Sequence, residues 1–332
     1  MKWYRTAFST GPMKANSIAA CVGTATVMLL VSMWVPFFGP FLSVLVPLPF
    51  LLFATKEGLS QGVKAVVITV LIVGLIGNLS RNPQVIFLSL EFGLLGLIIS
   101  EIFKRRFTIG KTIFWGTSLM LVIGFIILIL ISLTQGVGPF QLVSNYLQSN
   151  LKAAFLIYEN KELDQEKLLQ LQEYIKIVAN VMMKIYPALV ILGTGFIVWF
   201  NVIASKPLFR MGSLPYPDFE PTDRWRAPEH MVWGLIAAGF SLFLPVGGIR
   251  LAAINVLIVI LAIYAFQGFS IVLFYLNKFR VPFWIRFGVY FLIIFQQIFV
   301  VGLALAGIFD QWVDFRKIGS RKAHKSSMED GL

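Results

Sequence analysis

Long apolar runs recur along the whole chain, and only short polar stretches separate most of them. A run of about 18 or more apolar residues can cross a bilayer as a helix, because the hydrocarbon layer is about 30 Å thick. The runs are continuous rather than alternating, which does not fit the strands of a transmembrane β-barrel. The apolar segments lie at about 17–36, 40–55, 61–79, 84–103, 112–134, 181–204, 230–245, 251–276 and 285–308.

This pattern predicts an all-α fold, a polytopic transmembrane helical bundle with eight to nine spans. Two segments are short. The second contains Pro47 and Pro49, so it fits either a short tilted helix or a re-entrant segment. The seventh ends at Pro245 and also fits a re-entrant segment. Within the eighth, the pair Gln267-Gly268 suggests a local break in the helix.

The distribution of basic residues sets the expected orientation, because cytoplasmic loops are rich in lysine and arginine. With the N-terminus in the cytoplasm, the basic turn at 104–111 lies inside and the loop after Leu133 lies outside. If the seventh segment is re-entrant, more of the 28 basic residues lie inside, and so do both termini. We therefore favour eight spans over nine.

A polar insertion at about 136–180 is the largest interruption between the apolar segments. Apolar residues at helical spacing predict an amphipathic hairpin over the external mouth, whose second arm runs into the sixth segment. The hairpin fits a surface cover for helix ends or a lid over a ligand cavity. The spaced apolar residues are Leu168, Leu171, Ile175, Val178 and Met182.

The same pattern suggests how the chain is organised. We expect a membrane core at 1–205, which includes the insertion, and an interfacial loop at 206–229 that is rich in proline and aromatic residues. Membrane helices follow at 230–308. A polar tail at 309–332 has the composition of a disordered segment.

Composition supports the membrane class and narrows the partners. The 332 residues are 58% hydrophobic and 13% charged, whereas soluble domains are about 45–50% apolar and about 25% charged. The net charge of +12 would suggest nucleic acid as a partner of a soluble protein. Here the basic residues lie in short connections and at the tails. We therefore expect the lipid bilayer as a partner, and no nucleic acid.

A few polar side chains interrupt the apolar segments. A charged carboxylate inside a bilayer costs on the order of 2–3 kcal/mol, so Glu91 must be protonated, paired or facing a wet cavity. Amides cost less and often hold helices together. We treat these side chains as ligand-binding candidates that would line one polar pocket, with helix-to-helix hydrogen bonds as the alternative. The candidates are Glu91, Asn255, Gln267, Gln296 and Gln297.

The sequence contains no recognisable catalytic motif. It has no HExxH, GxSxG, phosphate-binding P-loop or dinucleotide-binding GxGxxG pattern. It has two histidines and one cysteine, Cys21, which do not form the pattern of a metal site. We therefore expect no enzymatic activity, no metal and no cofactor.

Several stretches resemble the bacterial YybS-like family of multi-pass membrane proteins, a domain of unknown function. The resemblance covers nearly the whole chain. The stretches are FGPFLSVLVPLPFLLFATKEG (38–58), EFGLLGLIISEIFKRR (91–106), RWRAPEHMVW (224–233), AINVLIVILAIYAFQGFSIVLFYL (253–276) and GIFDQWVDFRK (307–317).

That family is distantly similar to the substrate-binding S components of energy-coupling-factor transporters and to the rod-shape protein MreD. The resemblance implies an S-component-like core with extra C-terminal helices, located in the bacterial cytoplasmic (inner) membrane. In S components, a stripe of small residues on the first helix contacts the membrane coupling subunit. Ala19 and Gly23 occupy a comparable place here.

Two functions follow from the resemblance together with the polar residues. The first is a small-molecule- or lipid-binding membrane subunit of a transport assembly, with a membrane coupling subunit as its partner and an unknown ligand. The alternative is a non-enzymatic scaffold or assembly factor of the cell envelope, like MreD, with envelope-assembly proteins as partners. A shared cavity for the polar residues favours the first, and separate helix-to-helix pairs favour the second.

Overall fold

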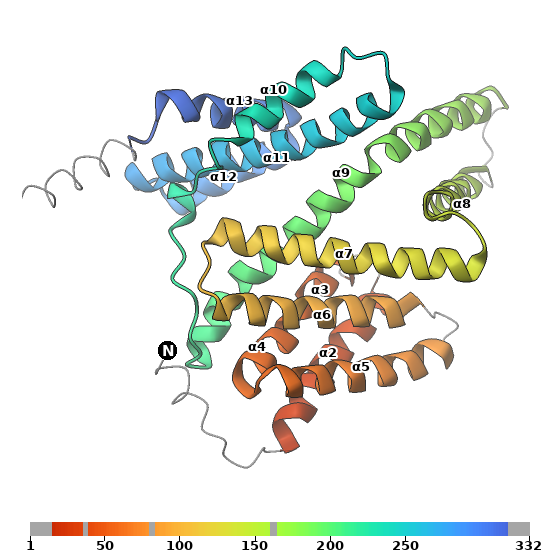
Figure 1. Cartoon of the computed structure of the whole chain (residues 1–332), viewed down its shortest axis with the longest axis vertical. Coiled ribbons are helices and arrows are strands. Elements are labelled where there is room, and N and C mark those ends of the chain that lie inside the picture. The colour runs from red at the N-terminus through yellow and green to blue at the C-terminus, as the bar shows by residue number, and fades with distance from the viewer. Residues whose placement is uncertain (1–14, 36–38, 80–83, 160–164, 318–332) are drawn as a thin grey trace, which may run out of the picture. The chain divides into compact units, whose positions relative to one another are not determined.

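The computed structural model describes residues 15–35, 39–79, 84–159 and 165–317 (Figure 1). Within these ranges all regular secondary structure is helical, which confirms the predicted all-α membrane fold. The helices are α2 (Ala15–Trp34), α3 (Gly39–Leu45), α4 (Pro47–Glu57), α5 (Leu59–Leu79), α6 (Gln84–Lys104), α7 (Ile109–Gln135), α8 (Pro139–Glu159), α9 (Gln165–Met211), the short 3-10 helix η1 (Thr222–Arg224), α10 (Met231–Ser241), α11 (Gly247–Lys278), α12 (Phe283–Phe295) and α13 (Gln297–Val313).

Seven helical segments in the described part of the chain are long and apolar enough to cross a membrane. The bent pair of α12 and α13 would be an eighth. Helix α10 has only 11 residues, which at 1.5 Å per residue is about half the thickness of the hydrocarbon layer. The seventh apolar segment is therefore too short to cross, and the lower end of the expected range of eight to nine spans is the one that fits.

The residues group into two compact units. Unit 1 comprises Met1–Pro139 and Gly193–Phe219, and unit 2 comprises Phe140–Leu192 and Glu220–Leu332. The domain boundaries that we predicted from composition remain a prediction. Each unit is described by itself below.

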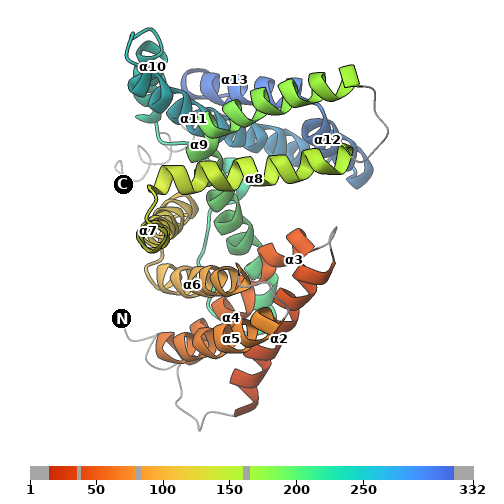
Figure 2. The same cartoon turned by 90° about the vertical axis from the view of Figure 1, so that its right-hand side faces the viewer.

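Unit 1 is built on close contacts between α4, α5 and α6, which lie together in both views (Figures 1 and 2). Glycines allow these helices to approach. A Cβ atom at Gly96 of α6 would lie 2.6 Å from the carbonyl oxygen of Pro47, and one at Gly62 of α5 would lie 2.7 Å from the Cβ of Ala54. Small residues that let helix backbones meet are the usual basis of packing inside membranes.

The second apolar segment of unit 1 consists of two short helices, α3 and α4, with Pro47 at the start of α4. The buried amide of Asn201 on α9 donates to the carbonyl of Val44 at 2.8 Å. It also donates to the carbonyl of Ile197 at 2.9 Å. The carbonyl of Val44, close to the break between α3 and α4, therefore accepts a hydrogen bond from the protein, as a membrane interior requires.

Unit 2 is centred on α11, with α10 and α13 packed beside it in both views (Figures 1 and 2). A Cβ atom at Gly268 of α11 would lie 2.0 Å from the carbonyl oxygen of Leu303, and one at Gly307 of α13 would lie 2.0 Å from that of Tyr264. Helix α11 runs unbroken through Gln267-Gly268, so the expected break there is wrong. Gly268 lets the backbone of α13 approach α11 closely, and it does not change the direction of α11.

The polar insertion forms α8 and the first part of α9, while the residues that connect them lie outside the described part. Helix α9 has 47 residues and continues into the sixth apolar segment, as expected for the second arm. Leu171, Ile175 and Val178 are half-buried, and Met182 is exposed. The side chain of Leu168, which belongs to the same predicted apolar face, lies outside the described part.

Candidate functional site

Glu91 lies on α6 of unit 1, and its side chain is exposed. Phe87 and Leu88, which precede it by four and three residues on the same helix face, are 49% and 43% exposed. Gly93 and Gly96 on the other side of α6 face the interior of the unit. The carboxylate is therefore placed on the outer surface of unit 1, among side chains suited to lipid.

Asn255 lies on α11 of unit 2, and its amide is occupied by the backbone of α9. Its oxygen accepts a hydrogen bond from the Ala188 N–H at 2.8 Å, and its nitrogen donates to the Lys184 carbonyl at 2.8 Å. In an unbroken helix residues 188 and 184 would pair with each other. Pro187 lies directly before this point and removes a backbone donor. The side chain of Asn255 thus bonds the Ala188 N–H and the Lys184 carbonyl of α9, next to the proline in that helix.

Gln267 also lies on α11, where it is 1% exposed, and it joins a buried ionic cluster. Its oxygen accepts from the Ala227 N–H at 3.1 Å, and its nitrogen donates to a carboxylate oxygen of Asp310 at 3.0 Å. A terminal nitrogen of Arg316 donates to the same oxygen of Asp310 at 2.7 Å. The side chains of both ions are 0% exposed. Buried charges persist only when they are paired and hydrogen-bonded, as these are.

The cluster extends to the loop after α9. Arg316 donates to the carbonyls of Asp223 and Trp225 at 2.9 and 3.0 Å. Arg226 forms an ion pair with Asp314, and its Nε lies 3.9 Å from Asp310. These contacts hold residues 223–227 against the end of α13. The cluster therefore links three separate parts of the chain within unit 2.

Asp310 and Arg316 were not among the candidate residues, and we expected Arg226 only as one of the mixed charges of a solvated interfacial loop. Asp310 lies just beyond the end of the last apolar segment, where a charge looks like an ordinary helix end. A signal was present, however. The cluster joins residues from three of the stretches that carry the family resemblance, at 224–233, 253–276 and 307–317. These stretches, which are distant in sequence, were reason to expect a common site.

Gln296 and Gln297 lie at the bend between α12 and α13. The two helices meet at 98°. Gln296 is extended, with φ −109° and ψ 104°, and both side chains are exposed. Among the described residues neither side-chain amide has a hydrogen-bond partner, so these glutamines are placed apart from the interactions of Asn255 and Gln267 on α11.

Ala19 and Gly23 lie on α2 and are both exposed. No atom lies within 4 Å of the position that a Cβ would take at Gly23. Val27 and Val31, at 59% and 37% exposure, continue the same line at intervals of four residues. This side of α2 is therefore open, with small residues at one end and valines at the other.

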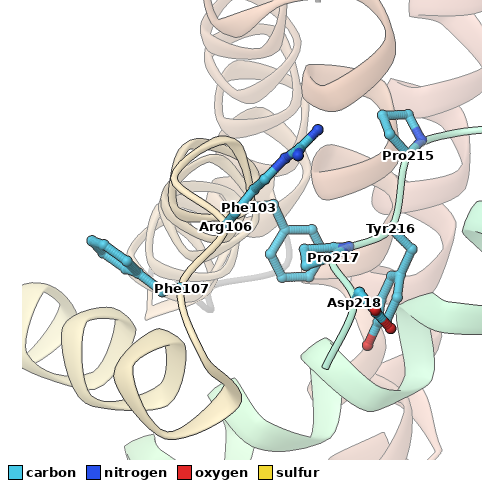
Figure 3. A pocket seen from close by; sticks show the side chains of 7 residues that line it. All are labelled: Phe103, Arg106, Phe107, Pro215, Tyr216, Pro217 and Asp218. Atoms are coloured by element: carbon cyan, nitrogen blue, oxygen red, sulfur yellow. The ribbon is translucent and has the colours of Figure 1, made fainter. Parts of the chain in front are cut away.

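One pocket lies at the end of α6, outside the apolar spans (Figure 3). Its volume is about 320 Å³. Phe103, Arg106 and Phe107 come from the α6 end, and the segment Pro215–Asp218 comes from the loop after α9. All of these residues belong to unit 1. In the part of the chain that the structure describes, no group of three or more histidine, cysteine, aspartate or glutamate side chains could hold a metal ion.

Substitution of Glu91 by glutamine is expected to leave yield and melting temperature near those of the unaltered protein. The side chain is exposed, and substitutions at such positions usually change stability by no more than about 0.5 kcal/mol. Thermal melting in detergent measures the effect, and retention of co-purifying small molecules tests the predicted ligand role of Glu91. A clear drop in melting temperature would show instead that the carboxylate supports the fold.

Comparison with known proteins places the chain in a family. No curated protein and no solved structure matches it. A family model described as "Predicted membrane protein (DUF2232)" matches residues 24–311, which include α4 to α12 and all but the last residues of α13. The chain therefore belongs to the DUF2232 family of multi-pass membrane proteins.

Proposed function

We propose that this protein is a non-enzymatic scaffold or assembly subunit of the bacterial cell envelope, held in the cytoplasmic membrane with its N-terminus inside. The observation that carries the proposal is the bend at Gln296, which the rest of unit 2 leaves exposed in the described part of the chain. The resemblance to MreD and the lack of a catalytic motif agree with this role.

The bend lies within a run of apolar residues. Ile294, Phe295 and Ile298 around it are 75%, 67% and 73% exposed. At the start of α13 the Phe299 N–H donates to the Gln296 carbonyl at 3.0 Å, which leaves the N–H groups of Gln297 and Ile298 without a backbone acceptor among the described residues. The amides of Gln296 and Gln297 are exposed beside them. In hydrocarbon, irregular backbone is tolerated only where protein or a water-filled cavity covers it. A helix of a partner protein that offers polar groups would satisfy these requirements.

The open side of α2 is a second surface for a partner. Ala19 and Gly23 let another backbone approach closely, as small residues do between membrane helices. If the chain resembles an S component, a coupling subunit would contact this stripe, whereas a scaffold would use it for an envelope protein. Both uses require the stripe to be open within unit 1, as it is.

The paired amides favour a scaffold over a transporter subunit. A transport site needs polar groups that converge on a ligand. Here Asn255 is occupied by backbone groups of α9, and Gln267 by Ala227 and Asp310. A small-molecule- or lipid-binding subunit of a transport assembly is the second candidate, and the specific observation that favours it is the pocket beside Arg106.

Purification from native membranes in mild detergent, followed by mass spectrometry, tests the proposal. We expect Ala19→Leu with Gly23→Leu, or Gln296→Leu with Gln297→Leu, to reduce a stoichiometric partner about tenfold, a loss of about 1.4 kcal/mol in binding. Gly124→Leu is the matched control, because Gly124 is exposed on α7 and no atom lies within 4 Å of its Cβ position.

The identity of the partner separates the two functions. Envelope-synthesis proteins support the scaffold, whereas a coupling subunit with ATPases supports the transport subunit and contradicts the scaffold. If no protein is retained by the unaltered chain, or if Gly124→Leu is as harmful as the other variants, the assembly role is wrong.

A further inference from the structure

The pocket at the end of α6 has a rigid aromatic floor. The ring of Phe103 meets those of Phe209, Tyr216 and Phe219 edge to face, with centroids 5.6, 5.6 and 5.9 Å away. Such pairs add to the stability that burial alone gives. The Tyr216 hydroxyl donates to the carbonyl of Val202 at 2.8 Å, which fixes the loop after α9 against the helix. The pocket wall is therefore held by packing that does not depend on a ligand.

The charge in the pocket comes from Arg106 and Asp218, which lie on opposite walls in Figure 3. Burial raises the pKa of the Tyr216 phenol, so this residue stays neutral and adds no charge. The surroundings are basic. Arg105 and Lys111 are exposed on the adjoining turn, and Arg210 is exposed next to Phe209. The potential around the pocket therefore favours an anionic ligand.

The pocket also lies where a lipid headgroup would be. It sits beyond the end of one apolar span, at Lys104, and before the start of the next, at Ile109. Phe114 and Trp115 lie about one turn into α7 and are 63% and 47% exposed, and aromatic side chains of this kind suit the membrane interface. A volume of about 320 Å³ is at the small end of ligand sites, which suits a headgroup and leaves acyl chains outside.

We propose that this pocket binds the phosphodiester headgroup of an anionic phospholipid that carries free hydroxyl groups. Arg106 pairs with the phosphate, because guanidinium groups form strong charge-assisted hydrogen bonds with phosphate oxygens. Asp218 accepts hydrogen bonds from the headgroup hydroxyls, and the rings of Phe103 and Tyr216 pack against its carbon atoms. The acyl chains run along the exposed aromatic residues of α7. The site is independent of the proposed scaffold function.

Lipid retention of the full chain tests this site. The protein is placed in nanodiscs of phosphatidylethanolamine with a minor amount of phosphatidylglycerol, and lipids retained after detergent extraction are measured by native mass spectrometry. Arg106→Gln should reduce retained phosphatidylglycerol by clearly more than fivefold, because about fivefold is already the effect of losing any cation near an anionic surface and this variant also loses the hydrogen bonds to the phosphate. Arg105→Gln is the matched control, because it removes the same charge from the adjacent exposed residue.

Further measurements distinguish a specific lipid site from general attraction to an anionic surface and from a site for free phosphate. Equal losses in both arginine variants would mean general attraction to an anionic surface and would overturn the site. Protection from thermal unfolding by inorganic phosphate as strong as that by phosphatidylglycerol would mean a phosphate site rather than a lipid site. Asp218→Asn keeps Arg106 intact, and in nanodiscs that hold equal minor amounts of phosphatidylglycerol and phosphatidic acid it should shift retention from phosphatidylglycerol towards phosphatidic acid. No shift would exclude the proposed contact with the hydroxyls.

Discussion

Substitution of Asp310 by alanine is expected to lower the free energy of unfolding by about 3–5 kcal/mol, the usual cost of leaving a buried charge without its partner. The side chain of Arg316 is 0% exposed, so its guanidinium would remain in the interior without the carboxylate. The substitution also removes the acceptor for Gln267 and for the Phe315 N–H. Thermal and denaturant unfolding in detergent measure the loss.

A matched exposed pair provides the control. Glu101 and Lys104 form an ion pair with side chains 39% and 35% exposed, and Glu101→Ala should cost at most about 1 kcal/mol. Combining Asp310→Ala with Arg316→Met should recover part of the loss, because the unpaired charge is removed as well. Unfolding of Asp310→Ala at the same temperature as the unaltered protein would show that the ion pair does not hold unit 2 together.

Hydrogen exchange gives this first prediction a local measurement. Residues 223–227 are held to the end of α13 through Arg316, Arg226 and Gln267. We therefore expect amide exchange in this loop to rise in Asp310→Ala well before the helices of unit 2 open, since local opening requires less free energy than global unfolding.

The second large effect is expected at the crossing of α11 and α13. Gly268→Ala or Gly307→Ala would place a methyl group 2.0 Å from a backbone carbonyl oxygen of the other helix. Backbone cannot move aside as a flexible side chain can, so the helices must separate. We expect the free energy of unfolding to fall by about 3 kcal/mol, which is the upper part of the usual range for overpacking. A lower melting temperature would show this loss.

Gly302→Ala on the same helix α13 is the control with the opposite sign. No atom lies within 4 Å of its Cβ position, and alanine is favoured over glycine in a helix by about 1 kcal/mol. Its melting temperature should therefore stay the same or rise. If Gly268→Ala and Gly302→Ala behave alike, the helices do not cross as closely as the glycines indicate.

The sequence alone determined where most helices lie. The segments expected at 61–79, 84–103 and 112–134 correspond to α5, α6 and α7, whose ends differ by a few residues at most. This success has a local cause: the length of an apolar run decides whether a helix can cross hydrocarbon, and each run is read without knowledge of the others.

Prolines predicted the ends of helices less well than apolar runs predicted the helices themselves. The loop that we expected from residue 206 begins only after Met211, and α9 contains both Pro187 and Pro207. A proline ends a helix unless other groups satisfy the freed backbone. At Pro187 that group is the amide of Asn255, 67 residues away from Ala188 in the chain. No local pattern shows such a partner.

The surroundings of each polar residue were decided by the tertiary structure. From the sequence, Asn255, Gln267, Gln296 and Gln297 were equivalent amides in apolar runs. In the structure Asn255 and Gln267 are occupied by internal contacts, whereas the two others are exposed at a bend. Composition and periodicity state how polar a segment is, but the partner of a buried amide or charge depends on which distant segments the fold brings within hydrogen-bonding distance. Hydrophobic length therefore determined the membrane helices, and only packing determined which polar groups form internal hydrogen bonds and which stay exposed.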